Sequence, residues 1–117
     1  QVDHAVNASI AMLKKLKNLN EELAKEGRDP INIGIGLYTG SAVVGNMGSE
    51  LRLNYTAMGD TVNVASRLEG LNKEYKTQII IGEATMKKVS DKYNFKFLGS
   101  VQVKGRIEPV NIYTLDI

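Results

Sequence analysis

The sequence predicts a single α+β domain, in which helices and strands alternate along 117 residues. Three observations lead to this class. In two segments the apolar residues recur at three- and four-residue steps, which is typical of amphipathic helices. In several shorter segments they alternate with polar residues or run continuously, which is typical of strands. The length suits one domain rather than two, and no repeat or linker divides the chain.

The first element is a long amphipathic helix, expected from Asp3 to about Glu26. Asp3 is a suitable cap for its start, and Gly27 followed by Pro30 is a typical stop. One face is expected to be buried, and lysines and glutamates fill much of the opposite face. The residues that form the expected apolar stripe are Ala5, Met12, Leu16, Leu19 and Leu23.

A strand with two unlike faces is expected next, over Ile31–Leu37. Every second residue is aliphatic, whereas Gly34 and Gly36 leave the other face nearly bare backbone. Because glycine weakens a strand, its use there indicates that another element packs closely against this face. Residues 39–41 are expected to form a turn, and Ala42–Val44 a short second strand.

The second half of the chain predicts one further long helix and several strands. Asn46–Asn54 is expected to be a loop and Tyr55–Met58 a short strand. A helix is expected over Thr61–Lys73, with Asp60 as its N-cap and with Val64, Leu68 and Leu71 on its buried face. The remaining expected elements are a buried strand Gln78–Ile81, a short helix Glu83–Ser90, and strands Phe95–Leu98 and Val110–Leu115.

Composition excludes several classes of function. The chain is 43% hydrophobic and 24% charged, as in ordinary globular proteins, and its net charge of +2 gives no basic surface for nucleic acid. There is no cysteine, and the one histidine, His4, is interpreted as a surface residue. Thiolate chemistry, a histidine metal site and a Ser-His-Asp triad are therefore excluded.

The common nucleotide-binding motifs are absent too. Gly34 and Gly36 lack the third glycine of the dinucleotide motif, because Thr39 occupies that position. Gly40 and Gly45 have the spacing of a phosphate-binding loop, but no Lys and Ser/Thr follow them. Neither pattern assigns a nucleotide site to this chain.

One polar pair is suited to phosphate chemistry. Asn63 and Arg67 are four residues apart, so they lie one turn apart on a helix face that excludes the Val64 stripe. A carboxamide and a guanidinium in this arrangement can hold a sugar oxygen and a phosphate, for which arginine is the planar bidentate donor. The same pattern also describes two solvated surface residues. Taken by themselves, the residues favour this second interpretation.

Three separated segments together resemble one enzyme family. The segment 55–72, YTAMGDTVNVASRLEGLN, is similar to the hallmark segment of the class III adenylate/guanylate cyclases. Segments 31–49, INIGIGLYTGSAVVGNMGS, and 100–115, SVQVKGRIEPVNIYTL, resemble the same family. The likeness runs in order from Asp3 to Leu115 and is strongest to the bacterial type that is linked to a sensor. It implies a ferredoxin-like α+β fold and conversion of ATP to cyclic AMP and pyrophosphate in signal transduction.

The resemblance also implies roles for single residues. Asn63 would hydrogen-bond the ribose, and Arg67 would stabilise charge on the α-phosphate as the 3′-oxygen attacks it. Lys104 would contact the β- and γ-phosphates. Thr56 stands where the family reads the purine edge and favours ATP over GTP. The stretch 40–48 resembles the hairpin that reaches toward a dimer partner.

The family's metal ligands have no counterpart in this sequence. Two Asp residues near the start of the family's domain bind two Mg or Mn ions, and no Asp of this chain matches them. We therefore expect residues 1–117 to be the C-terminal portion of a single cyclase domain, without its first strands. Such a chain would bind no metal and be inactive alone.

The expected partners follow from the same likeness. They are ATP and either a second copy or a complementary cyclase segment, with no nucleic acid and no direct membrane contact. The expected location is the cytoplasm, as a free protein or as the cytoplasmic domain of a membrane-anchored parent. The alternative function is a non-catalytic, cyclase-like regulatory or dimerisation module.

Overall fold

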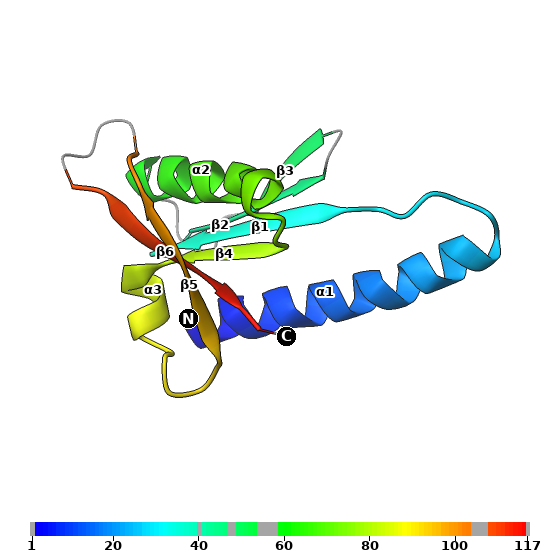
Figure 1. The fold of residues 1–117 in the computed structure, drawn as a ribbon, viewed down its shortest axis with the longest axis horizontal. Helices are drawn as coiled ribbons and strands as arrows, with labels where there is room; N and C mark the ends of the chain where they lie inside the picture. The colour runs from blue at the N-terminus through cyan, green and yellow to red at the C-terminus, as the bar shows by residue number, and fades with distance from the viewer. Residues whose placement is uncertain (1, 40, 47–48, 54–58, 104–107, 117) are drawn as a thin grey trace.

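A six-stranded sheet with helices on both faces forms the molecule (Figure 1). The structure is a computed structural model and describes residues 2–39, 41–46, 49–53, 59–103 and 108–116. The helices are α1 (Val2–Lys25), α2 (Gly59–Tyr75) and α3 (Glu83–Lys87), and the strands are β1 (Ile33–Tyr38), β2 (Ser41–Asn46), β3 (Ser49–Leu53), β4 (Ile79–Gly82), β5 (Phe95–Val101) and β6 (Val110–Leu115). The predicted α+β class is confirmed.

The strand order is β3-β2-β1-β4-β6-β5. The pair β1 and β4 is parallel, and α2 lies on the connection between them, whereas the neighbouring pairs are antiparallel. The carboxyl ends of β1 and β4, at Tyr38 and Gly82, therefore lie at the same end of the sheet. Ligand sites of open α/β sheets are commonly found at such ends.

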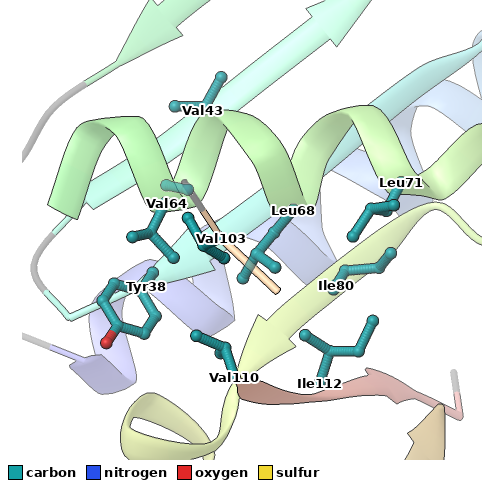
Figure 2. Close-up of a cluster of buried hydrophobic side chains, with 10 residues drawn as sticks. Tyr38, Val43, Val64, Leu68, Leu71, Ile80, Val103, Val110 and Ile112 are labelled. Atoms are coloured by element: carbon teal, nitrogen blue, oxygen red, sulfur yellow. The ribbon is translucent and has the colours of Figure 1, made fainter. Parts of the chain in front are cut away.

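Two hydrophobic cores lie on opposite faces of the sheet. Core 1 packs between the sheet and α2, and Figure 2 shows its side chains. Core 2 packs between the sheet and the first half of α1. The central strand β4 serves both, because Ile80 belongs to core 1 and its neighbours Ile79 and Ile81 belong to core 2. The sequence prediction of a strand buried on both faces is confirmed here.

The two faces of β1 are as unlike as the sequence predicted. Ile35 and Leu37 are fully buried in core 2. On the opposite face, Gly34 and Gly36 lie directly under α2, whose backbone and side chains occupy the space that a β-carbon would need. The expected close packing over these glycines is therefore confirmed, and α2 is the element that provides it.

The expectation of a loop over residues 46–54 is wrong. Residues 49–53 form β3, which pairs antiparallel with β2 from Ala42↔Leu53 to Asn46↔Ser49. The glycines and asparagines around this segment suggested a loop, but backbone pairing with β2 outweighs those local preferences. The expected strand Tyr55–Met58 lies outside the described residues.

Two other expectations need correction. α2 begins at Gly59, so Asp60 lies inside the first helical turn and is not the N-cap. α3 ends at Lys87 rather than near Ser90. The backbone N of Lys88 and that of Val89 instead donate turn-type hydrogen bonds to the carbonyl oxygens of Thr85 and Met86, three residues back.

Two apolar residues expected to be buried are exposed. Leu19 on α1 is 42% exposed and Ile31 is 36% exposed. β1 starts only at Ile33, and the backbone of Ile31 is held instead by the side chain of Asn20, which accepts from its N–H at 2.8 Å and donates to its carbonyl oxygen at 2.9 Å. Leu19 lies at the edge of the buried stripe of α1, in the half of the helix that extends beyond the sheet (Figure 1), whereas Leu16 and Leu23 in that half are 9% and 7% exposed.

Candidate functional site

The outer face of α2 carries the predicted polar pair. Asn63 and Arg67 are both exposed, whereas Val64, Leu68 and Leu71 on the other side of the helix are 3%, 0% and 1% exposed in core 1. The structure thus places the two polar side chains one turn apart on the solvent side, as the spacing predicted. A bound molecule can reach both at once.

Asn72 fixes the C-terminal half of this helix to the sheet. Its side chain is 5% exposed, and its Nδ2 donates to the carbonyl oxygen of Ile35 on β1 at 3.1 Å and to that of Glu69 at 3.0 Å. Its Oδ1 accepts from the hydroxyl of Thr77 at 2.8 Å. A buried carboxamide with these partners is satisfied, so it holds α2 at a defined height over β1.

Val103, the residue before Lys104, is the last described residue of its segment. It is 5% exposed and packs in core 1 with Val64 and Leu68 (Figure 2). Lys104 itself and Thr56 lie outside the described residues, so the structure brings together Asn63 and Arg67 only. The described neighbour of Lys104 packs in the same core as Val64, the residue that follows Asn63.

A polar cavity of about 260 Å³ opens at the carboxyl end of β1 and β4, with Tyr38, Glu83 and Asn111 among its lining residues. Nδ2 of Asn111 donates to Glu83, and the hydroxyl of Ser100 donates to Asn111. Nζ of Lys87 lies 3.0 Å from Glu83 Oε1. These contacts lower the pKa of Glu83, first through the Asn111 hydrogen bond and then through Lys87, and the carboxylate raises the pKa of Lys87.

Sequence reasoning did not find this network or the hydroxyl contacts around α2. Glu83 and Asn111 are 28 residues apart, and nothing in their local sequence marks them as partners. The local sequence carries no signal for these contacts, because Thr85 and Asn72 stand among charged residues, and only their burial shows that each needs a hydrogen-bond partner.

Within the described ranges, no group of three or more His, Cys, Asp or Glu side chains is placed to hold a metal ion. The part of the chain that the structure describes therefore does not fit a two-metal centre, and we derive no step through one. The described helices also include none that is long and apolar enough to span a membrane.

The arrangement of helices and strands is shared with solved nucleotidyl cyclases. The family model described as the adenylate and guanylate cyclase catalytic domain matches residues 1–116. The chain belongs to this family, whose members bind ATP, work as dimers and use divalent metal ions.

Individual cyclases are similar along nearly the whole chain. Adenylate cyclase 1 of Rhizobium meliloti is 41% identical over 95% of the chain, which spans 17% of that protein. The adenylyl cyclase CyaB from P. aeruginosa matches in structure with a TM-score of 0.70 and 34% identity, over 97% of this chain and 57% of that one. The guanylyl cyclase Cya2 matches with a TM-score of 0.64 and 33% identity, over 95% of this chain and 55% of that one.

Proposed function

We propose that this chain forms part of an adenylate cyclase that converts ATP to cyclic AMP and pyrophosphate in signal transduction. The observation that carries the proposal is the exposed pair Asn63 and Arg67, one turn apart on a helix whose other face is buried in core 1. The cyclase family match over residues 1–116 supports it. The reaction would take place in the cytoplasm, where ATP is available.

In this proposal, α2 supplies groups that recognise the reacting part of the nucleotide. The ribose 3′-hydroxyl releases its proton to water as its oxygen bonds to the α-phosphorus. The bond from that phosphorus to the bridging oxygen breaks, and pyrophosphate leaves with the electron pair of that bond. The guanidinium of Arg67 donates to the α-phosphate oxygens as charge builds on them, and Asn63 hydrogen-bonds the ribose so that its 3′-oxygen faces the phosphorus. Fixed donors of this kind lower the barrier because they need no reorganisation during the reaction.

Two further side chains complete the proposed binding site. Lys104 contacts the β- and γ-phosphates and stabilises the leaving pyrophosphate. Thr56 reads the purine edge and favours ATP, because a polar group left unpaired by the wrong base weakens its binding. Support comes from their places in the three segments that resemble the family.

The proposed partner is a second copy of the chain or a complementary cyclase segment. Leu19 and Ile31 expose apolar surface at the end of α1. A groove of about 670 Å³ lies between this helix and Gln78, with Leu13 and Ala24 among its lining residues. A partner that covers this region would remove apolar surface from water, which supports assembly.

The test is a cyclase assay on the complete product of the natural reading frame that encodes this chain. We expect cyclic AMP from ATP in the presence of Mg or Mn ions, and no cyclic AMP from the Arg67→Ala variant beyond a small residual rate. A folded wild-type protein that binds ATP but forms no cyclic nucleotide would contradict the proposal and favour a regulatory or dimerisation module.

A further inference from the structure

The turn between β1 and β2 is held by two hydroxyl groups from different helices. The backbone N–H of Thr39 donates to Oγ1 of Thr85 on α3 at 2.7 Å. Two residues later, Oγ of Ser41 and Oγ1 of Thr61 on α2 share a hydrogen bond of 2.7 Å. This turn therefore connects the carboxyl end of β1 to the start of α2 and to α3.

The side chains of Ser41 and Thr85 are fully buried, each 0% exposed. A buried hydroxyl without a hydrogen-bond partner is destabilising, so both hydroxyls favour the contacts described above. Thr39 has a φ of 31°, a value that β-branched residues rarely adopt. Because the Thr85 hydroxyl accepts from this same residue, it stabilises the turn in its strained form, and Ser41 is held in place beside Thr61.

Thr61 lies in the first turn of α2, two residues before Asn63. The other end of the helix is held by Asn72 through the carbonyl oxygen of Ile35. α2 therefore has a polar contact to the sheet at each end. Exposed side chains lie at about 5 Å from a helix axis, so a rotation of about 10° displaces them by about 1 Å. A displacement of that size at a reacting centre typically costs about 10²-fold in rate.

We propose that the Ser41–Thr61 contact is a positioning contact, which sets the rotation of α2 and so the placement of Asn63 and Arg67 on the nucleotide. Neither residue touches the substrate in this role, and the contact acts through Asn63 and Arg67. The inference rests on the proposed function, because it assigns a consequence of the contact for the cyclase reaction.

The test compares Ser41→Ala with Ser9→Ala in the complete natural gene product. Ser9 is the matched control: it is 5% exposed and its hydroxyl donates to the carbonyl oxygen of Ala5 at 2.8 Å, but it lies on α1, on the opposite face of the sheet. We expect Ser41→Ala to lower kcat about tenfold with KM for ATP changed less than about twofold. Ser9→Ala should leave both constants unchanged.

A second comparison separates positioning from a general loss of structure. In a background that carries both Asn63→Ala and Arg67→Ala, Ser41→Ala should have no further effect on kcat, because both groups that the contact positions are absent. If the two effects multiply instead, or if Ser9→Ala lowers kcat as much as Ser41→Ala, the inference is wrong. Should Ser41→Ala fail to fold, Thr61→Val removes the same bond from a half-buried position, and Thr61→Ser, which keeps the hydroxyl, should retain kcat.

The outcomes also distinguish this inference from the proposed function. An active wild-type protein with normal kcat in both Ser41→Ala and Thr61→Val would overturn the inference and leave the proposed function standing. A wild-type protein that folds, binds ATP and makes no cyclic AMP would overturn the proposed function and the inference with it.

Discussion

A β-carbon added to Gly36 on β1 would lie 2.2 Å from the carbonyl oxygen of Ala65 on α2. Non-bonded atoms do not approach a β-carbon closer than about 3.0 Å, so the helix rests on bare backbone here. A β-carbon on Gly45 of β2 would instead meet the carboxylate of Glu69, at 2.1 Å, which is the far end of a flexible side chain. Gly36 therefore sets how closely α2 approaches the sheet, and so where its outer face lies.

We expect Gly36→Ala to destabilise the protein by about 2 kcal/mol or more, because a rigid backbone atom must move to admit the methyl group. Gly70→Ala provides the matched control on α2: that glycine is exposed and a β-carbon there meets nothing within 4 Å. Since alanine is the better helix former, Gly70→Ala should stabilise by about 0.5–1 kcal/mol. Urea unfolding followed by circular dichroism measures both, and equal effects of the two changes would contradict the close packing.

Arg67→Ala should lower kcat about 10²–10³-fold and change KM for ATP far less, because the proposed contact strengthens as charge builds on the α-phosphate. Lys73→Ala, which removes an exposed cation from the last turn of the same helix, is the control and should leave kcat unchanged. A rise in KM alone would assign Arg67 to ground-state binding. Unchanged kinetics would return it to an ordinary surface residue.

The parts of the fold that depend on the local pattern of apolar residues could be predicted from the sequence. The stripe of Val64, Leu68 and Leu71 identified the buried face of α2, and Gly34 and Gly36 indicated a close neighbour, although not which one. What the sequence could not show depends on distant residues. β3 forms because β2 is available to pair with it, and the sequence pattern did not show that Leu19 is exposed although Leu16 and Leu23 of the same stripe are buried.

In the candidate site, too, the features that depend on local spacing could be predicted, and those that depend on distant residues could not. The spacing of Asn63 and Arg67 placed them on one helix face without knowledge of the rest of the fold. The contacts that hold that helix could not be foreseen, because Ser41 is 20 residues from Thr61, and Thr39 is 46 residues from Thr85. Serine and threonine are common in exposed turns, and only burial reveals that these hydroxyls have structural partners.

The complete natural gene product should turn over ATP faster than GTP. A hydroxyl such as that of Thr56 can pair with one purine edge, and the other base then leaves a polar group unpaired. The comparison is of kcat/KM for the two nucleotides at the same metal concentration, with Thr56→Val as the variant that removes the hydroxyl. Equal kcat/KM values in the wild-type protein would remove Thr56 as a determinant of base selection.

The 117-residue chain by itself should form no cyclic AMP above a protein-free control. The two metal-binding Asp motifs of the family are not matched in this sequence, and the reaction depends on neutralising charge around the triphosphate. The assay uses the purified chain with ATP and Mn ions, beside the complete gene product as a positive control. Clear cyclic AMP formation by the isolated chain would show that its own residues suffice.

The ion pair between Asp3 and Lys92 should make the stability of the protein depend on pH. Nζ of Lys92 lies 2.6 Å from Oδ2 of Asp3 and ties the start of α1 to the segment before β5. The hydrogen bond and charge of Lys92 hold the pKa of Asp3 below its ordinary value of 3.8, and the carboxylate raises the pKa of Lys92 above 10.5.

The direction of this dependence follows from the two shifts. A carboxyl group with a lowered pKa in the folded state contributes stability above its ordinary pKa, and that stability is lost as the pH falls through the lowered value. The Lys92 contribution is present below 10.5 and is lost as the pH rises through the raised value. The pair thus stabilises the fold over the neutral range and stops doing so at both extremes.

Asp3→Asn should therefore lower the melting temperature at about pH 7, and its effect should shrink as the pH falls through the lowered pKa of the wild-type carboxyl. Asp29→Asn is the control, because Asp29 is exposed in the connection between α1 and β1, away from Lys92. Lys92→Met should lower the melting temperature near neutral pH in the same way, because it removes the other partner of the ion pair. If the difference between wild type and Asp3→Asn stays constant from pH 7 to pH 2, the carboxylate form of Asp3 is not what holds α1, and the ion pair does not contribute to stability.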